Sequence, residues 1–191
     1  FGAITIFFDQ PYKVGERIVF GGYDGVVEDI GFRSTRVRTL TGHLVTVPNS
    51  KIANESVENI GRRPYIRRLE WIRLPFDTPW AQVEEAVQVI RDVLAEPELA
   101  EPINPTIGAD SFPPRVNFFG FHEHGYQIIM LYWFAPPAYW DYLAHGEKVN
   151  LRIVEEYQDR GIRFAMPPRA VYHHQGDAPD DSAEPDPPPP A

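Results

Sequence analysis

The sequence predicts an α+β protein in which a small β domain is followed by a ferredoxin-like α/β domain. Residues 12–60 contain short β-prone runs separated by turn signals about every 8–12 residues, which is typical of small all-β domains. Residues 66–172 instead alternate strand and helix patterns in the order β-α-β-β-α-β, the order of a split βαβ layer. The change of pattern near residue 63 divides the chain into two domains.

Glycine-containing turns divide the first domain into four runs. The turns are at Gly21-Gly22, Asp24-Gly25 and Thr41-Gly42, and the runs are residues 18–20, 26–27, 35–40 and 44–47. Strands this short and closely spaced predict a small, strongly bent β-barrel or sandwich. Pro48 ends the last run, and we expect Asn49 or Ser50 to cap one helical turn that ends near Ile52.

The second domain opens with a strand at residues 66–74 and continues into a well-marked helix. Thr78 is the predicted N-cap, Pro79 occupies the first helical position, and Pro97 ends the helix. Apolar residues recur between them at steps of three and four, which predicts one buried stripe of Trp80, Val83, Val87, Ile90 and Leu94.

Two strands and a second helix complete the predicted pattern. Residues 116–122 and 126–134 form a hairpin across the turn at residues 123–125. The helix follows from residue 136 to about residue 160, and Gly161 is placed to be its left-handed C-terminal cap. One face of this helix carries Tyr139, Tyr142, Val149, Ile153 and Tyr157.

Composition narrows the class of protein. The chain has no cysteine, which excludes disulfides and thiolate chemistry, and its formal net charge of −9 at pH 7 weighs against nucleic-acid binding. It begins at Phe1, not at a methionine, which suggests part of a longer protein. Residues 174–191 are rich in proline and acidic residues and have little to bury, so we expect them to be disordered.

No residue pattern indicates an enzyme, a cofactor or a metal site. His122 and His124 would share one face of a strand, but zinc needs three or four ligands and the other histidines are scattered, so solvated loop histidines are the favoured interpretation. Adjacent carboxylates such as Glu84-Glu85 point in different directions on a helix and cannot act on one atom. No Ser-His-Asp set is suggested by the spacing.

Arginines are the remaining candidates for function. Arg36 and Arg38 share one face of their predicted strand, and Arg62, Arg63, Arg67 and Arg68 cluster where the two domains join. One interpretation is that they contact lipid headgroups or set an ion-attracting potential. The other is ordinary surface charge, and the sequence leaves both open.

A series of short motifs runs from residue 11 to residue 50. The motifs are, in order, Pro11-Tyr12-Lys13-Val14-Gly15-Glu16, Gly22, Gly25-Val26-Val27, Ile30, the RSTRVRT run at residues 33–39, and Val47-Pro48-Asn49-Ser50. Together, in this order and spacing, they resemble the signature of small-conductance mechanosensitive channels. Tyr139-Trp140-Asp141, Arg160-Gly161-Ile162, Phe164 and Pro167 resemble the closing helix and last strand of the same family. The resemblance spans nearly everything up to His173.

The resemblance implies a detailed domain assignment. Residues 1–10 would end a pore-lining helix, residues 11–63 would form an Sm-like β-barrel domain, and residues 64–168 the ferredoxin-like α/β domain. Gly15 and Gly25 would hold turns of the β domain, and Pro48, Asn49 and Ser50 would lie at its rim near the pore helix. Residues 169–173 would form a C-terminal strand in which Ala170, Val171 and Tyr172 enter a barrel shared by the subunits, ahead of the acidic tail at residues 174–191.

The resemblance also implies an assembly and a function. Family subunits form a homoheptamer anchored in the inner (plasma) membrane by helices that precede this region, with a hollow vestibule on the cytoplasmic side. Such a channel opens under membrane tension and releases ions and small osmolytes on hypo-osmotic shock. It needs no cofactor, no catalytic residue and no nucleic acid.

A second class of function stays open at this stage, namely a soluble Sm-like ring module that binds RNA or protein. The acidic charge and the lack of a basic, aromatic surface pattern weigh against RNA. Two or more apolar stretches of about 20 residues encoded upstream of Phe1 would favour the channel.

Overall fold

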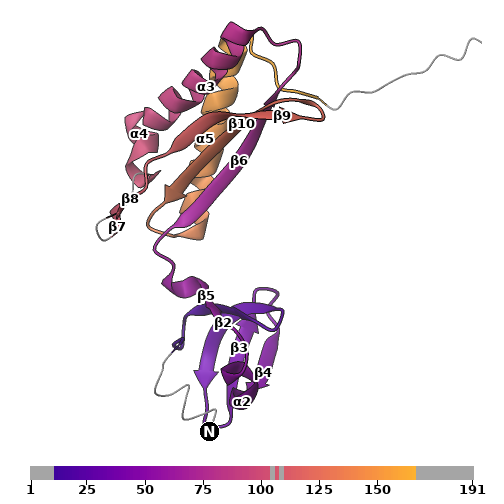
Figure 1. The fold of residues 1–191 in the computed structure, drawn as a ribbon. Helices are drawn as coiled ribbons and strands as arrows, with labels where there is room; N and C mark the ends of the chain where they lie inside the picture. The colour runs from indigo at the N-terminus through magenta and orange to yellow at the C-terminus, as the bar shows by residue number, and fades with distance from the viewer. Residues whose placement is uncertain (1–10, 104–105, 108–109, 167–191) are drawn as a thin grey trace, which may run out of the picture.

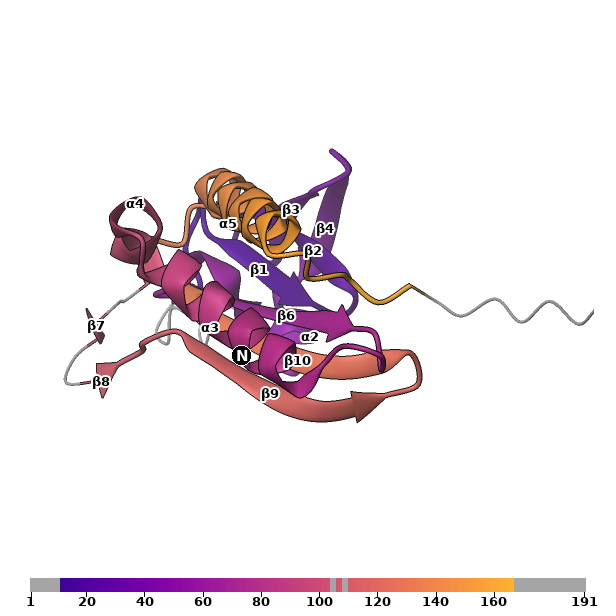
Figure 2. The ribbon, with the colours of Figure 1, turned by 90° about the horizontal axis from the view of Figure 1, so that it is seen from above.

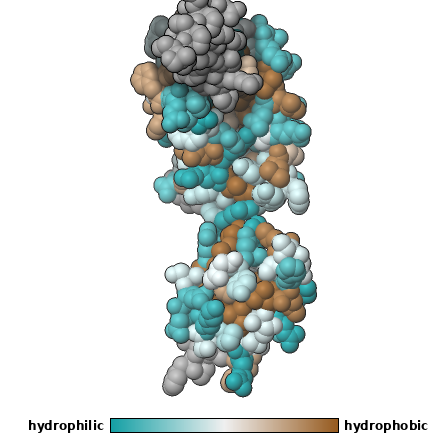
Figure 3. Space-filling view, turned by 90° about the vertical axis from the view of Figure 1, so that its right-hand side faces the viewer, coloured by the Kyte–Doolittle hydropathy of each residue, from teal (hydrophilic) through white to brown (hydrophobic). Residues whose placement is uncertain are grey.

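The computed structural model of the chain describes residues 11–103, 106–107 and 110–166. Two lobes follow one another along the chain and meet at a narrow waist, as Figures 1 and 3 show. Each lobe has its own cluster of buried apolar side chains. The chain therefore builds two hydrophobic cores, as expected for two domains joined by a short linker.

The first lobe is a five-stranded antiparallel sheet with strand order β4-β3-β2-β1-β5. Its elements are β1 (Arg17–Phe20), β2 (Tyr23–Ile30), β3 (Ser34–Thr39), β4 (Leu44–Pro48), α2 (Asn49–Ala53) and β5 (Glu58–Asn59). The strands bury alternate residues, and the core contains Tyr12, Ile18, Phe20, Val27, Val37, Val47 and Ile52. The short strands predicted for this part of the sequence are confirmed.

The turn between β1 and β2 shows why the sequence places two glycines there. Phe20 pairs with Tyr23, so the turn has only two residues. Gly21 and Gly22 both have positive φ, +50° and +83°, which a two-residue turn of this kind requires and other residues rarely adopt.

The predicted barrel is not closed by the strands that the structure describes. The strand pairings run in one line and leave β4 and β5 as its two edges. β5 has only two residues, which pair with β1, and no pairing between β5 and β4 closes the sheet among the described residues. A register shift between Val27 and Asp29 bends β2 against β3, as the expected strong curvature requires.

The second lobe is a three-stranded antiparallel sheet with strand order β6-β10-β9, and α3 and α5 pack on one of its faces (Figure 2). Its main elements are β6 (Ile66–Leu74), α3 (Trp80–Ala95), β9 (Arg115–His122), β10 (Gly125–Phe134) and α5 (Tyr139–Asp159). Smaller elements occupy the connections: η1 (Ile60–Arg62), α4 (Pro97–Ala100), η2 (Glu101–Ile103), β7 (Thr106–Ile107) and β8 (Asp110–Ser111). The predicted order of strand, helix, hairpin and helix is confirmed.

A final segment lies along the free edge of β6. The backbone N–H of Ala165 donates to the carbonyl of Arg73 at 2.8 Å, so the chain runs beside β6 after it leaves α5. The predicted strand residues Ala170, Val171 and Tyr172 lie outside the described residues, as do residues 1–10 and the tail.

The C-terminal end of α5 agrees with the sequence prediction, whereas the N-terminal end of α3 differs from it. Gly161 has φ +67°, its N–H donates to Gln158, and the next N–H donates to Tyr157, which is a Schellman cap as predicted. Thr78 is not the N-cap of α3. The helix begins two residues later, because the N–H of Thr78 closes a separate turn onto Pro75 and its side chain is buried.

The predicted apolar stripes are largely buried, except at their first residues. In α3, Val83, Val87, Ile90 and Leu94 enter the core, whereas Trp80 is exposed. In α5, Val149, Ile153 and Tyr157 are buried, whereas Tyr139 is about half exposed. Helical periodicity identifies the direction of the core, but it does not tell how far along the helix the core extends.

A buried arginine joins three elements of the second lobe. The Arg68 guanidinium of β6 donates to the Tyr132 hydroxyl of β10 at 2.7 Å, and to the Asn150 side chain and the Gly146 carbonyl of α5 at 2.7 and 3.2 Å. The Tyr132 hydroxyl in turn lies 3.3 Å from Nδ1 of His145. This network fixes α5 against the sheet, and it contradicts the interpretation of Arg68 as a surface charge.

Glu16 connects the first lobe to the linker. Its carboxylate accepts hydrogen bonds from the Asn59 side chain at 2.8 Å, from Arg62 Nε at 2.9 Å and from the backbone N–H of Lys13 at 2.8 Å. These donors, with Arg62 the strongest and Asn59 next, lower the pKa of Glu16 to about 2. The ionised form of Glu16 therefore links the first lobe to Asn59 and Arg62, where the connection to the second lobe begins.

The Arg68 network gives a first testable prediction. Replacing Arg68 with Met keeps an apolar stem of similar length but leaves Asn150 and the Gly146 carbonyl without their donor, so we expect the free energy of unfolding to fall by about 2 kcal/mol. Urea unfolding followed by tryptophan fluorescence measures it. The matched control is Arg163→Met, which removes an exposed ion pair with Asp77 and should change stability by no more than about 0.5 kcal/mol. Equal effects of the two substitutions would refute the structural role of Arg68.

The Glu16 cluster gives a second prediction, which concerns pH. Because folding lowers this pKa from 4.5 to about 2, the carboxylate stabilises the native state above about pH 4.5, and this contribution is lost as the pH falls toward 2. Glu16→Gln should lower the free energy of unfolding by about 1 kcal/mol at pH 7, a figure reduced for solvent screening.

The difference between Glu16→Gln and the unmodified chain should shrink steadily below pH 4.5. Urea unfolding should be followed by circular dichroism. Tryptophan fluorescence would not report on the first lobe, because all four tryptophans lie in the second lobe. Glu58→Gln, at an exposed glutamate of β5, serves as the control and should change stability by less than about 0.5 kcal/mol. A difference that persists unchanged at pH 2 would contradict the assignment.

Candidate functional site

Two glycines of the signature serve different structural purposes. Gly15 has φ +90°, and its N–H donates to the Val27 carbonyl at 2.8 Å, so it forms a turn as expected. Gly25 lies inside β2, not in a turn. A Cβ atom at this position would lie 2.3 Å from the Arg38 carbonyl oxygen, so glycine is required by the close approach of β3.

Asn49 is the centre of the signature in the structure. Its side-chain amide donates to the carbonyls of Gly31 at 2.8 Å and Phe32 at 3.3 Å, and its backbone N–H donates to the carbonyl of Arg33 at 2.9 Å. One buried residue thus satisfies three consecutive carbonyls of the turn between β2 and β3. The expected helix cap is not formed, because the side chain of Asn49 is used for this turn and α2 has no side-chain cap.

A buried chain of polar groups supports Asn49 from the other side. The hydroxyl of Thr35 donates to Asn49 Oδ1 at 2.9 Å and lies 3.3 Å from the hydroxyl of Tyr12. Burial raises the pKa of Tyr12, so its hydroxyl remains neutral. We call Tyr12, Thr35, Asn49 and the turn of residues 31–33 the Asn49 junction.

The Asn49 junction presents one aromatic side chain to solvent. Phe32, at the tip of the turn, is 84% exposed, although the backbone around it is fixed by Asn49. The junction lies next to α2, at the end of the first lobe farthest from the waist (Figure 1). Sequence reasoning missed Phe32, but a phenylalanine between Gly31 and Arg33 in a turn between strands is a signal that could have identified it.

The other two rim residues have minor contacts. Pro48 ends β4 opposite Ser34, and both its ring and the Ser50 side chain face solvent. The Ser50 carbonyl accepts a hydrogen bond from Asn54 at 2.8 Å. Of the predicted rim residues, Asn49 therefore carries the structural role.

The structure does not gather the predicted arginines into one site. Arg36 lies 3.9 Å from Asp29, and Arg38 forms a two-pronged ion pair with Glu28 that lowers the pKa of this carboxyl group. Arg62 contacts Glu16, Arg63 donates to the Pro137 carbonyl at 3.5 Å, and Arg68 is buried. Arg67 is exposed and has no salt bridge to any residue that the structure describes.

His122 and His124 lie together at the β9–β10 turn, with ring centroids 5.8 Å apart. Their Nδ1 atoms are buried without a hydrogen-bond partner among the described residues. Across residues 11–103, 106–107 and 110–166, no three histidine, cysteine or acidic side chains are placed to hold a metal ion. Within the same residues, no helix is both long and apolar enough to cross a membrane.

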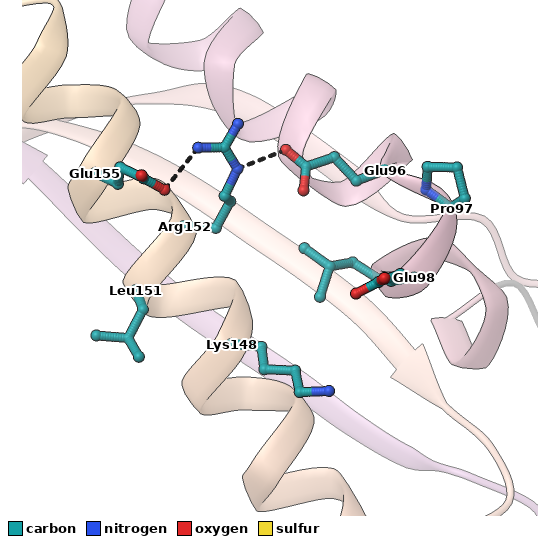
Figure 4. A pocket seen from close by; sticks show the side chains of 8 residues that line it. Glu96, Pro97, Glu98, Lys148, Leu151, Arg152 and Glu155 are labelled. Carbon is teal, nitrogen blue, oxygen red and sulfur yellow. Dashed lines mark hydrogen bonds and ion pairs between the residues drawn. The ribbon is translucent and has the colours of Figure 1, made fainter.

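A groove of about 800 Å³ lies between α4 and α5. Figure 4 shows Arg152 of α5 between Glu96 and Glu155, at 2.8 and 2.7 Å, with Leu151 and Lys148 farther along the same helix. These carboxylates raise the pKa of Arg152 and hold its side chain in place. The groove has a mostly apolar surface and a charged wall.

Comparison with known proteins identifies the family. Residues 1–62 match the family model described as "Mechanosensitive ion channel, beta-domain". The chain is 30% identical to the large-conductance mechanosensitive channel MscMJLR of Methanocaldococcus jannaschii, covering 91% of this chain and 46% of that protein. It is 31% identical to the small-conductance channel MscMJ of the same organism, covering 88% of this chain and 45% of the relative. The chain spans less than half the length of these curated relatives.

Solved structures agree on the fold. Helicobacter pylori MscS in its closed state superposes with a TM-score of 0.67 at 20% identity, covering 91% of this chain and 64% of that one. Arabidopsis thaliana MSL1 superposes with a TM-score of 0.70 at 16% identity, covering 87% and 57%. Together with the signature between residues 11 and 50, the family model and the sequence relatives show that the chain belongs to the MscS-type family of mechanosensitive channels.

Proposed function

We propose that this chain forms the wall of the cytoplasmic vestibule of a membrane-tension-gated channel, which releases ions and small osmolytes on hypo-osmotic shock. The observation that supports it most is that both lobes, over 91% of the chain, superpose on a closed-state MscS channel. In this proposal the subunits form a homoheptamer in the inner (plasma) membrane.

The proposed domain assignment follows the two cores. Residues 11–63 are the Sm-like β domain, and residues 64–168 are the ferredoxin-like α/β domain. The fourth strand of this second domain belongs at the open edge of β6, where Ala165 donates a hydrogen bond to Arg73. The assignments of residues 1–10 to the end of a pore-lining helix, of residues 169–173 to a strand shared between subunits and of residues 174–191 to an acidic tail stay predictions, because these residues lie outside the described part of the chain. The exposed Arg36 belongs to the charged surface that permeating ions meet.

The Asn49 junction is the proposed contact between the β domain and the membrane region. It lies at the end of the lobe farthest from the α/β domain, and its rigid turn holds an apolar ring in solvent. A fixed, exposed aromatic side chain of this kind suits docking against an apolar helix.

The channel itself is tested with the complete coding sequence. Expressed in cells that lack their own mechanosensitive channels, it should give suction-activated currents in membrane patches and should increase survival of a sudden drop in osmolarity. A complete protein that gives no tension-activated current would overturn the proposal, and binding of RNA by the purified ring would favour a soluble Sm-like module instead.

Phe32 provides a sharper prediction within the same experiment. Phe32→Ala should leave stability within about 0.5 kcal/mol, because the ring is exposed, yet it should raise the suction needed for opening, because the membrane region then loses an apolar contact. The control is Leu40→Ala, an exposed apolar residue just after β3, at the other end of the strand from the junction. The same threshold in both variants would refute the role of the junction.

A further inference from the structure

A groove of about 480 Å³ runs between α3 and the edge strand β9. Most of its lining comes from α3, from Trp80 to Arg91, and Phe118 of β9 closes the other side. Figure 2 shows α3 lying along β9. The core residues Val83 and Val87 also line the groove, so apolar side chains and charged side chains meet in it. The proposed function gives this groove no role. We call it the α3–β9 groove.

Two aromatic side chains in the α3–β9 groove remain accessible to a ligand. Trp80, the first residue of α3, is 69% exposed, and Phe118 is 41% exposed. Phe118 pairs with the buried Ile128, so its ring lies on the side of the sheet that carries the helices. Edge contacts hold this ring, with centroid distances of 5.9 Å to Phe121 and 6.0 Å to Tyr126. The β9 wall of the groove is therefore ordered in advance, which lowers the entropy cost of binding.

The α3–β9 groove also contains one uncompensated charge of each sign. Glu84 is exposed and forms no salt bridge with any residue that the structure describes, whereas its neighbour Glu85 lies 3.4 Å from Arg160. Arg91 donates through Nε and Nη2 to the carbonyl of Val116, at 3.1 and 2.8 Å. This carbonyl is neutral, and Arg91 has no carboxylate partner in the described part of the chain. The positive charge of Arg91 is thus held in a fixed place without being neutralised.

The spacing of these residues along α3 suits a small molecule. Glu84 and Arg91 are seven residues apart, which is two helical turns or about 10 Å along the helix axis. Trp80 precedes Glu84 by four residues, so the indole and the carboxylate lie on the same face of the helix, one turn apart. The groove therefore offers an aromatic surface and a negative charge toward the start of α3, and a positive charge two turns farther along.

We propose that the α3–β9 groove binds a small zwitterion that carries a methylated ammonium group and a carboxylate, a compound of the betaine class. The ammonium group lies against the aromatic rings of Trp80 and Phe118, beside the carboxylate of Glu84. The carboxylate of the ligand pairs with the guanidinium of Arg91, which Val116 holds in position. Methyl groups on the ammonium favour this surface, because aromatic rings attract a cation and also bury its apolar area.

Glycine betaine is the probe, and the 191-residue chain is the sample. Three related compounds each lack one feature of the probe. In 3,3-dimethylbutyrate a neutral carbon replaces the nitrogen without a change of shape, tetramethylammonium has no carboxylate, and glycine has no methyl groups. Isothermal titration calorimetry measures the dissociation constants. The indole N–H signal of Trp80 in nitrogen-15 NMR spectra shows whether binding occurs in the groove.

We expect glycine betaine to bind with a dissociation constant on the order of 1 mM and to shift the indole signal of Trp80. Each of the three related compounds should bind about threefold or more weakly, because each lacks either the positive charge, the carboxylate or the methyl contacts.

Substitutions in the groove separate the contacts. Trp80→Ala should weaken the binding of glycine betaine about tenfold, and Glu84→Gln about threefold. Arg91→Gln should weaken glycine betaine but leave tetramethylammonium unchanged, because only glycine betaine has a carboxylate. The matched control is Trp140→Ala, which removes a tryptophan that is 78% exposed near the start of α5 and should bind as the unmodified chain does. Circular dichroism checks that each variant is folded.

Any of four results would overturn the inference: no saturable binding of glycine betaine, equal binding of 3,3-dimethylbutyrate, equal effects of Trp80→Ala and Trp140→Ala, or equal weakening of glycine betaine and tetramethylammonium by Arg91→Gln. The inference goes beyond the proposed function and does not depend on it. Binding is measured on the chain alone, whereas the channel is tested by tension-activated current in the complete protein, so either can fail without the other.

Discussion

The orientation of α5 depends on the buried guanidinium of Arg68, and much of the second lobe depends on that orientation. A buried charge is tolerated only when its donors are satisfied, and here the partners come from β10 and from two positions on α5. Gly146 allows the close approach, because a Cβ there would lie 3.0 Å from the guanidinium. With the helix rotation fixed in this way, Val149 and Ile153 enter the core while Leu151 and Trp140 face solvent.

A comparable constraint organises the first lobe. Backbone carbonyls in a turn must find donors when they are removed from water, and Asn49 supplies three donors to consecutive carbonyls from a single position. Thr35 and Tyr12 complete the arrangement by fixing the amide. The result is a rigid turn that presents Phe32, in a lobe whose core contains only a few large side chains.

In both lobes, buried polar residues therefore fix the position of a helix or a turn, and apolar residues form the core. The same holds at the waist, since Glu16 is held by Asn59, which precedes a short 3-10 turn, and by Arg62, the last residue of that turn. Ion pairs elsewhere are exposed and contribute little to stability.

The sequence by itself determined the features that depend on local chemistry: the glycine turn at Gly21-Gly22, the two long helices, the hairpin and the Gly161 cap, because each is encoded within a few neighbouring residues. The signature between residues 11 and 50 also determined the family. Only the tertiary structure decided that Arg68 is buried, that Gly25 accommodates a neighbouring strand and that Asn49 holds a turn about 18 residues away in place of capping its own helix. These roles depend on partners distant in sequence, so no local pattern could distinguish a buried guanidinium from an exposed one or a close approach from a turn.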